Sequence, residues 1–160
     1  MKQRIRVATI ITNRNKVLLV KHVHPESEYT WWVPPGGGIK KEDSSIFDCA
    51  KRETFEETNL KIEALKIIYL REYLDKRDSL KNIDGKLNIE IFILADSYDG
   101  EVNMNNIKGN GPDELYIKQI EWLSKDEMQD IVVYPEILKN DFWIDYRQKF
   151  FNTKYLGRQI

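Results

Sequence analysis

Cysteine, histidine and long apolar runs are scarce in this 160-residue sequence, which contains one cysteine and two histidines. A lone cysteine excludes an internal disulfide framework, so we expect Cys49 to act as a small buried hydrophobe in a reducing compartment. The apolar stretch near the start is too short and too soon interrupted for a signal peptide or a membrane span. The sequence therefore predicts a cytoplasmic protein with no membrane segment.

A charge excess of either sign is also missing. The sequence has 25 Lys and Arg against 26 Asp and Glu, which gives a net charge of −1. Nucleic-acid-binding domains usually carry a clear basic excess, so we expect no dedicated nucleic-acid surface. His22 and His24 have no cysteine or further histidine nearby, and we expect them in an exposed polar loop rather than at a metal site.

Length and composition predict a single globular domain over residues 1–160, in which 152–160 form a frayed tail. Segments rich in Val, Ile and Thr, or with alternating apolar residues, predict the strands. These lie at 4–12, 17–20, 30–33, 62–74, 87–95 and 117–123, and turn residues 13–15 join the first two strands into a hairpin. We expect a charged loop at 75–85 and a long irregular loop at 97–114.

Two further helices are predicted near the end of the chain. Ser124 and Glu127 form a capping box, and Pro135 can occupy the first position of a last helix. The apolar stripe of that last helix is expected to pack in the core or at a homodimer contact. Together with a helix in the middle of the strands, this order predicts an α+β fold.

The most informative stretch is 34–60. Three glycines are followed by Asp43, Ser44 and Ser45 and then by a helix-favouring run. Ser44 or Ser45 can cap the start of the helix, and Asn59 can adopt the left-handed conformation of its end. Helical periodicity places a set of apolar and acidic residues on one arc; these are Ile46, Cys49, Ala50, Glu53, Glu56 and Glu57.

Three carboxylates therefore continue the inward stripe of this helix. Glu53, Glu56 and Glu57 repel one another, and Arg52 alone cannot balance them. Hard divalent cations with oxygen ligands are the usual compensation, so we expect Mg²⁺ or Mn²⁺. The upstream glycines allow the backbone to approach closely, and a carbonyl of residue 36 or 37 can complete the ligand set. The alternative is a solvated Glu-rich surface without a function.

Residues 37–60 resemble the Nudix box, G-x5-E-x7-R-E-U-x-E-E-x-G-U, where U is aliphatic. The match is carried by Arg52-Glu53, Glu56-Glu57 and Leu60, and 32–38 (WVPPGGG) is similar to the usual approach to the box. Three positions depart from the pattern: the first acid is Asp43 with one extra residue before the arginine, or is replaced by Ser44; Thr54 replaces an aliphatic residue; and Asn59 replaces a glycine. We expect the loop to absorb the extra residue, since within the helix it would rotate the acidic face by about 100°.

The resemblance implies a Nudix-like α/β/α sandwich with a mixed sheet. It also implies metal-dependent hydrolysis of a phosphoanhydride in a nucleoside diphosphate linked to another group, such as a nucleotide sugar like ADP-ribose, a dinucleoside polyphosphate or a (deoxy)nucleoside triphosphate. In that reading Glu53, Glu56 and Glu57 hold the metal with a main-chain carbonyl of Gly36 or Gly37. Arg52 orients the carboxylates.

The general base is expected to be Glu53 or an acid of the later loop, with Glu114 as the first candidate and Glu121 as the second. Substrate contacts are expected from Lys40, from Lys21 or His22, and from Trp31. Trp31 and Trp32 point to opposite faces of a strand, so one can pack in the core while the other stacks on a base. Glu90 lies opposite the isoleucines of its strand and can face the site.

Two other functions stay open at this point. A Nudix-like module could sense a nucleotide without cleaving it; the altered first acid favours this, and the intact Arg-Glu-x-x-Glu-Glu core argues against it. An interaction protein with a merely surface-exposed acidic helix would show no metal-dependent change in stability.

Overall fold

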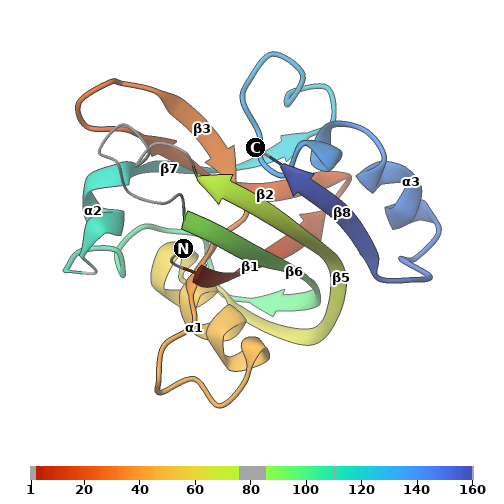
Figure 1. The fold of residues 1–160 in the computed structure, drawn as a ribbon, viewed down its shortest axis with the longest axis horizontal. Helices are drawn as coiled ribbons and strands as arrows, with labels where there is room; N and C mark the ends of the chain where they lie inside the picture. Colours follow the sequence, from red (N-terminus) through yellow and green to blue (C-terminus); the bar gives the residue numbers. More distant parts are fainter. Residues whose placement is uncertain (1–2, 76–85, 110, 160) are drawn as a thin grey trace.

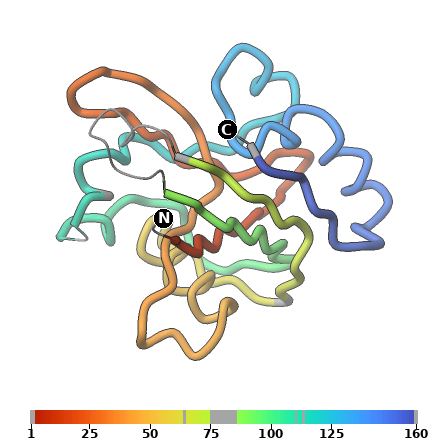
Figure 2. Tube along the Cα trace, in the orientation of Figure 1, coloured from red at the N-terminus to blue at the C-terminus, as the bar shows by residue number. Residues whose placement is uncertain are grey.

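A computed structural model describes residues 3–75, 86–109 and 111–159 of the chain, shown as a ribbon in Figure 1 and as a trace in Figure 2. Residues 76–85 of the predicted charged loop lie outside the described residues. The elements in chain order are β1 (Gln3–Asn13), β2 (Lys16–Val23), β3 (Thr30–Val33), β4 (Gly36–Gly38), α1 (Ile46–Thr58), β5 (Lys61–Asp75), β6 (Lys86–Asp99), α2 (Pro112–Tyr116), β7 (Ile117–Ser124), a 3-10 helix η2 (Glu136–Lys139), α3 (Phe142–Arg147) and β8 (Lys154–Gln159).

The strands form one mixed sheet, in the order β3-β2-β1-β6-β5-β8, with β4 paired to β1 and β7 paired to β2 (Figure 1). β1 runs parallel to β6, and β5 runs parallel to β8. The other described pairs are antiparallel. Strands and helices therefore combine as the α+β prediction requires. Among the described residues, no helix is long and apolar enough to cross a membrane.

The two faces of β1 pack against different layers, because successive side chains of a strand point to opposite sides. Val7 and Ile11 belong to the hydrophobic cluster that contains Cys49 of α1. Ala8 and Ile10 belong to the cluster that contains Phe142 and other residues of the C-terminal segments. The sheet thus separates α1 from the C-terminal helices, and Cys49 is buried as expected.

The predicted hairpin joins β1 to β2. Arg14 and Asn15 both have positive φ, 47° and 60°, which is the backbone of a type I′ turn and suits the twist of a hairpin. β2 extends beyond the predicted strand at 17–20 and includes residues expected in a polar loop. The reason is tertiary: residues 20–23 find hydrogen-bonding partners in β3.

Helix α1 begins and ends where the sequence predicts. The Ser45 hydroxyl accepts a hydrogen bond from the backbone N–H of Asp48 at 3.1 Å, and Asn59 has a φ of 66°. Cys49 and Ala50 on its inner face are fully buried. The helix start after Ser45 leaves the extra residue of the box in the loop at 39–45, as expected.

The glycine cluster at 36–38, which precedes the loop to α1, is itself a short strand. β4 pairs antiparallel with β1, with Gly37 opposite Val7 and Gly36 opposite Ala8. A Cβ added to Gly36 would lie 2.2 Å from the Val7 carbonyl oxygen and 2.5 Å from the Ala8 Cα. The glycine is therefore required for close packing of the two strands.

The Ser124 capping box forms, but no helix follows it. Ser124 N–H donates to the Glu127 carboxylate at 2.8 Å, and Glu127 N–H donates to the Ser124 hydroxyl at 3.3 Å. The next residues form turns, and the chain then returns to the sheet, where Val132 O accepts a hydrogen bond from Trp32 N–H at 2.8 Å. Pairing with β3 thus replaces the expected helix.

The single last helix expected after Pro135 is divided into η2 and α3. The Asn140 side chain accepts a hydrogen bond from Asp141 N–H at 2.6 Å, which competes with a continuous helical backbone. Leu138 and Phe142 are fully buried, so the apolar stripe packs in the core. The tail at 154–159 is strand β8 and not a frayed end, because β5 offers it an edge.

Candidate active site

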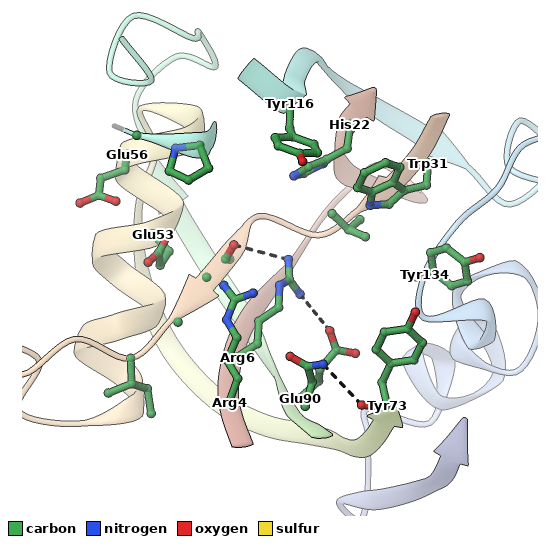
Figure 3. Close-up of a pocket in the computed structure, with 18 of the residues that line it drawn as sticks. Arg4, Arg6, His22, Trp31, Glu53, Glu56, Tyr73, Glu90, Tyr116 and Tyr134 are labelled. Atoms are coloured by element: carbon green, nitrogen blue, oxygen red, sulfur yellow. Dashed lines mark hydrogen bonds and ion pairs between the residues drawn. The ribbon is translucent and has the colours of Figure 1, made fainter. Parts of the chain in front are cut away.

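A cleft of about 1090 Å³ opens between α1 and the β2–β3 region (Figure 3). Glu53 and Glu56 lie at the α1 end, Arg4, Arg6 and Glu90 lie on the floor, and His22, Trp31 and Tyr116 lie at the β3 end (Figure 3). Its charged and aromatic lining consists of Glu53, Glu56, Glu90, Arg4, Arg6, Lys40, Arg71, His22, Tyr29, Trp31, Tyr73, Tyr116 and Tyr134.

Glu53 is in the closest contact with the glycine strand. Its side chain is 6% exposed, and a Cβ added to Gly37 would lie 2.4 Å from the Glu53 carboxylate. The carboxylate therefore rests directly on the Gly37 backbone. Only glycine at this position leaves room for it.

The other two acids of the helix lie beside Glu53. Glu57 is 2% exposed and accepts a hydrogen bond from Gly36 N–H at 3.1 Å, although it does not line the cleft. The Glu56 side chain is 23% exposed and lies 3.6 Å from the Lys40 ammonium. Glu53 and Glu57 thus lie at a sheltered place beside the glycines, as the helical periodicity predicts, whereas Glu56 is partly exposed. Their roles, and that of Arg52, stay predictions.

Arg52 connects the helix to the loop that precedes it. Its Nε and Nη2 donate to the two carboxylate oxygens of Asp43 at 2.8 and 2.7 Å, a bidentate pair. Nη1 donates to Glu53 Oε1 at 2.6 Å. The hydrogen bonds with Arg52 hold the pKa of Asp43 well below its usual value. Asp43, and not Ser44, is therefore the acid that the arginine engages.

The loop conformation aims Asp43 at the arginine. Lys40 N–H donates to Asp43 Oδ2 at 2.8 Å, and Asp43 N–H donates to Lys40 O at 3.1 Å. This tight turn brings the acid back toward α1. One additional loop residue is thus accommodated without a change in the register of the helix.

The acids and nearby carbonyl groups offer the oxygen ligands that hard divalent cations prefer. Within the described ranges, no three His, Cys, Asp or Glu side chains already surround a point where an ion would fit. Arg52 and Lys40 instead supply the positive charge, through their contacts with Glu53 and Glu56. The donor chemistry fits a divalent cation, which would compete with these two side chains for the carboxylates.

Three charged residues lie in register across the floor of the cleft. Arg6 on β1 is opposite Glu90 on β6, which is opposite Arg71 on β5. Arg71 forms an ion pair with Glu90, and Arg6 Nη1 lies 3.7 Å from the same carboxylate. Two guanidinium groups thus share one carboxylate, so positive charge is in excess among the three. Glu90 faces the cleft, as expected.

His22, Tyr29, Trp31 and Tyr116 form an aromatic wall at the other end of the cleft. The Trp31 ring stacks on His22 at 5.3 Å and on Tyr29 at 5.5 Å, and Tyr116 meets it edge-on at 6.3 Å. Trp31 lies on the cleft, whereas Trp32 is 7% exposed and belongs to the core. The two indoles therefore point to opposite faces, as the strand pattern predicts.

Lys40 and Trp31 line the cleft, but three other candidates do not. Lys21 points to the opposite face of β2 from His22, and its Nζ lies 5.8 Å from the Trp32 ring centroid. Glu114 is exposed and accepts a hydrogen bond from Gly109 N–H at 3.2 Å. Glu121 lies on β7, where its carboxylate accepts a hydrogen bond from Gln119. The alternation of side chains along β2 and β7 directs Lys21 and Glu121 away from the cleft, and the short helix α2 directs Glu114 away from it.

Several lining residues were not predicted from the sequence. Arg4 and Arg6 alternate with apolar residues in β1, and this period of two could have indicated a shared polar face. His22 was expected in an exposed loop, where it was the alternative to Lys21 for a substrate contact, and the extent of β2 was underestimated. Tyr116 and Tyr134 come from distant segments, and we find no signal in the sequence that places them at the cleft.

Comparison with known proteins agrees with the resemblance to the Nudix box. The NUDIX domain family matches residues 2–141, and no curated protein matches the sequence. The MutT NUDIX hydrolase from Burkholderia pseudomallei is 18% identical, with a TM-score of 0.64, 84% of this chain and 92% of that chain being covered. The E. coli ORF135 protein is 17% identical, with a TM-score of 0.66 and coverage of 95% and 96%.

A UDP-X diphosphatase is also similar, at 18% identity and a TM-score of 0.56, with 99% of this chain and 68% of that chain covered. At these identities the likeness to solved structures shows the fold, a Nudix-like sandwich with a mixed sheet. The family match covers most of the chain and includes the acidic helix. The chain therefore belongs to the NUDIX domain family, as a pyrophosphohydrolase of the Nudix type.

Proposed function

We propose that this protein hydrolyses a phosphoanhydride bond in a nucleoside diphosphate linked to another group, with Mg²⁺ or Mn²⁺ as cofactor. The supporting observation is the sheltered acidic cluster beside Gly37, which opens into a cleft with an arginine-rich floor. Nudix hydrolases act on small-molecule nucleotides and generally use divalent metal ions. Similar folds include MutT proteins and a UDP-X diphosphatase, so nucleotide sugars, dinucleoside polyphosphates and (deoxy)nucleoside triphosphates are all retained as substrates.

The cation would be held by Glu53, Glu56 and Glu57, with a main-chain carbonyl of Gly36 or Gly37. When bound, it supplies positive charge to the phosphate oxygens and lowers the pKa of a coordinated water. Arg52 keeps the helix acids in place, since it is itself anchored by a bidentate pair to the preceding loop.

Glu53 is the general base in this proposal. It combines a carboxylate held on the Gly37 backbone with a position on the cleft. A base must come within hydrogen-bonding reach of the attacking water. Glu114 and Glu121 do not line the cleft, so the geometry favours Glu53 over both.

Basic residues between the acids and the aromatic wall would bind the phosphate chain. Arg6 and Arg4 project into the cleft from β1 (Figure 3). Lys40 also lines the cleft, and its ammonium lies 3.6 Å from the Glu56 carboxylate. Arginine is well suited to phosphate because its planar donors match two oxygens at once. The base of the nucleotide would then lie against the aromatic wall, where Trp31 is central.

The test is a substrate panel. The protein is incubated with Mg²⁺ or Mn²⁺ and with a nucleotide sugar, a dinucleoside polyphosphate and nucleoside triphosphates, and the released products are identified by chromatography and phosphate assay. We expect turnover of at least one substrate class that stops on addition of EDTA. A Glu53→Gln variant is the matched control, and it should release no product above background.

Saturable nucleotide binding without product would instead support the sensing module. The structure weakens the argument for that module, because Arg52 pairs with Asp43, so the loop does supply an acid to the arginine of the box. An unchanged melting temperature on addition of Mg²⁺ would support a plain interaction protein. A single domain, a homodimer and a cytoplasmic location stay predictions, which limited proteolysis, light scattering and cell fractionation would check.

A further inference from the structure

The aromatic wall contains one side chain whose hydrogen-bonding role is determined by its surroundings. The imidazole of His22 stacks on Trp31 with the ring planes 25° apart, and the two residues are cross-strand partners of β2 and β3. Figure 3 shows the ring between Tyr116 and Trp31 at the cleft. Cross-strand packing thus holds the plane of the imidazole in the wall.

The backbone identifies which ring nitrogen carries the hydrogen. His22 Nδ1 lies 3.3 Å from the carbonyl oxygen of Val20. A carbonyl oxygen only accepts hydrogen bonds, so Nδ1 must be the donor. Burial, reinforced by the positive charge of Arg6, lowers the pKa of His22 to about 4, so that the ring is neutral at pH 7. Nε2 is therefore an unprotonated acceptor.

This acceptor is open to a ligand. None of the residues that the structure describes donates a hydrogen bond to His22 Nε2. Among the described residues, every side-chain nitrogen or oxygen that is sealed from solvent has a hydrogen-bond partner. Nε2 has no such partner within that part of the chain, so it is not sealed from solvent. His22 lines the cleft, and the accessible edge of its ring thus meets the space that a ligand would fill. The tyrosine hydroxyls and the indole N–H of the wall can all donate, whereas Nε2 can only accept.

We propose that His22 selects a nucleobase with an exocyclic amino group, by accepting a hydrogen bond from that group at Nε2. This inference rests on the proposed function, since it places the base of a nucleotide against the aromatic wall. A keto oxygen in the same position would set two acceptors against each other and leave both unpaired. Adenine and cytosine satisfy the requirement, and their keto counterparts hypoxanthine and uracil do not.

Binding of matched nucleoside monophosphates tests the inference. Isothermal titration calorimetry compares AMP with IMP and CMP with UMP, because each pair exchanges an amino group for a keto oxygen. We expect the wild-type protein to bind the amino member about tenfold more tightly. His22→Phe keeps an aromatic ring beside Trp31 but removes the acceptor, so the two members should bind within about twofold of each other.

His24→Phe is the control, because it removes the other histidine, which does not line the cleft. Its preference for the amino member should match that of the wild-type protein. Should His22→Phe fail to fold, His22→Leu removes the same acceptor and replaces it in the comparison.

Equal binding of both members by the wild-type protein would overturn the inference. A preference that survives the loss of His22 would also overturn it, and so would the absence of binding of all four nucleotides at millimolar concentration. The monophosphates contain no phosphoanhydride, so the result does not depend on turnover. A clear preference without hydrolysis of any diphosphate substrate would refute the proposed function alone. Hydrolysis with no preference would refute the role of His22 alone.

Discussion

Two clusters of buried charge, one at the C-terminal helices and one on α1, differ in how fully their charges are compensated. In the first, Asp145 is 4% exposed, accepts a hydrogen bond from the Tyr69 hydroxyl at 2.6 Å and forms an ion pair with Lys154. Burial, with the adjacent Asp145, raises the pKa of Tyr69 far above its usual value. The single carboxylate of this cluster is thus compensated by one cation and one hydrogen-bond donor. The cluster joins β5, α3 and β8.

The cluster on α1 is less balanced. Arg52 lies among Asp43, Glu53 and Glu56, Glu57 is buried alongside, and Lys40 lies 3.6 Å from Glu56. This surplus of negative charge should lower the stability of the fold, because crowded carboxylates repel one another and buried charge is costly. We therefore expect the C-terminal cluster to stabilise the fold and the acids of α1 to serve the proposed cation site.

Removing one acid from α1 should give the largest effect and the clearest separation of the two clusters. We expect Glu57→Gln to lower kcat/KM by on the order of 10³-fold, since a ligand to the cation is lost, which corresponds to several kcal/mol. The melting temperature should stay equal or rise, because glutamine can still accept from Gly36 N–H and one repulsive charge is gone. Steady-state kinetics and thermal melts measure both. Unaltered turnover would remove Glu57 from the site.

A second prediction tests the backbone support of the same cluster. Gly37→Ala should lower kcat/KM by about 10²-fold, because its Cβ would displace the Glu53 carboxylate and small misplacements of a reacting group are costly. The matched control is Gly38→Ala, whose Cβ would meet its nearest neighbour, Arg4 Nε, at an ordinary 3.5 Å. Kinetics of both variants, with circular dichroism to verify folding, measure the effect. Equal losses in the two variants would contradict the contact with Glu53.

The C-terminal cluster should respond in the opposite way. Asp145→Ala leaves the buried Tyr69 hydroxyl without its acceptor, so we expect a loss of about 2 kcal/mol in the free energy of unfolding, with kcat/KM within twofold of the wild type. Urea unfolding measures the loss. Adding Tyr69→Phe to this variant should cost little more, because the stranded hydroxyl is then removed. Fully additive losses would show that the two groups are not coupled.

The smallest expected effect concerns the dependence of stability on pH. Pairing with Arg52 depresses the pKa of Asp43 in the folded protein below its ordinary value of about 4. Its contribution to stability is therefore complete above pH 4 to 5 and decreases as the pH falls, because the unfolded chain binds the proton first. Asp43→Asn should melt at a slightly lower temperature at pH 7 and show a shallower decline below pH 4. Thermal melts from pH 3 to 7 measure both, and parallel acid profiles would contradict this role.

The features that the sequence predicted correctly are those set by neighbouring residues. The limits of α1 follow from Ser45 and Asn59, and the placement of Glu53 and Glu57 beside the glycines follows from the 3.6-residue period of a helix. The hairpin turn at 14–15 is equally local. These elements need no information from distant parts of the chain, so their residues suffice to specify them.

Only the tertiary structure decided the features that depend on strand pairing. The pairing of β4 with β1 makes the glycines a strand, and the extent of β2 brings His22 rather than Lys21 to the cleft. The floor arises where β1, β6 and β5 align, so that Arg6, Glu90 and Arg71 become neighbours although they lie far apart in the sequence. A strand residue changes face with a shift of one position, and the partners that set this register are remote in the chain.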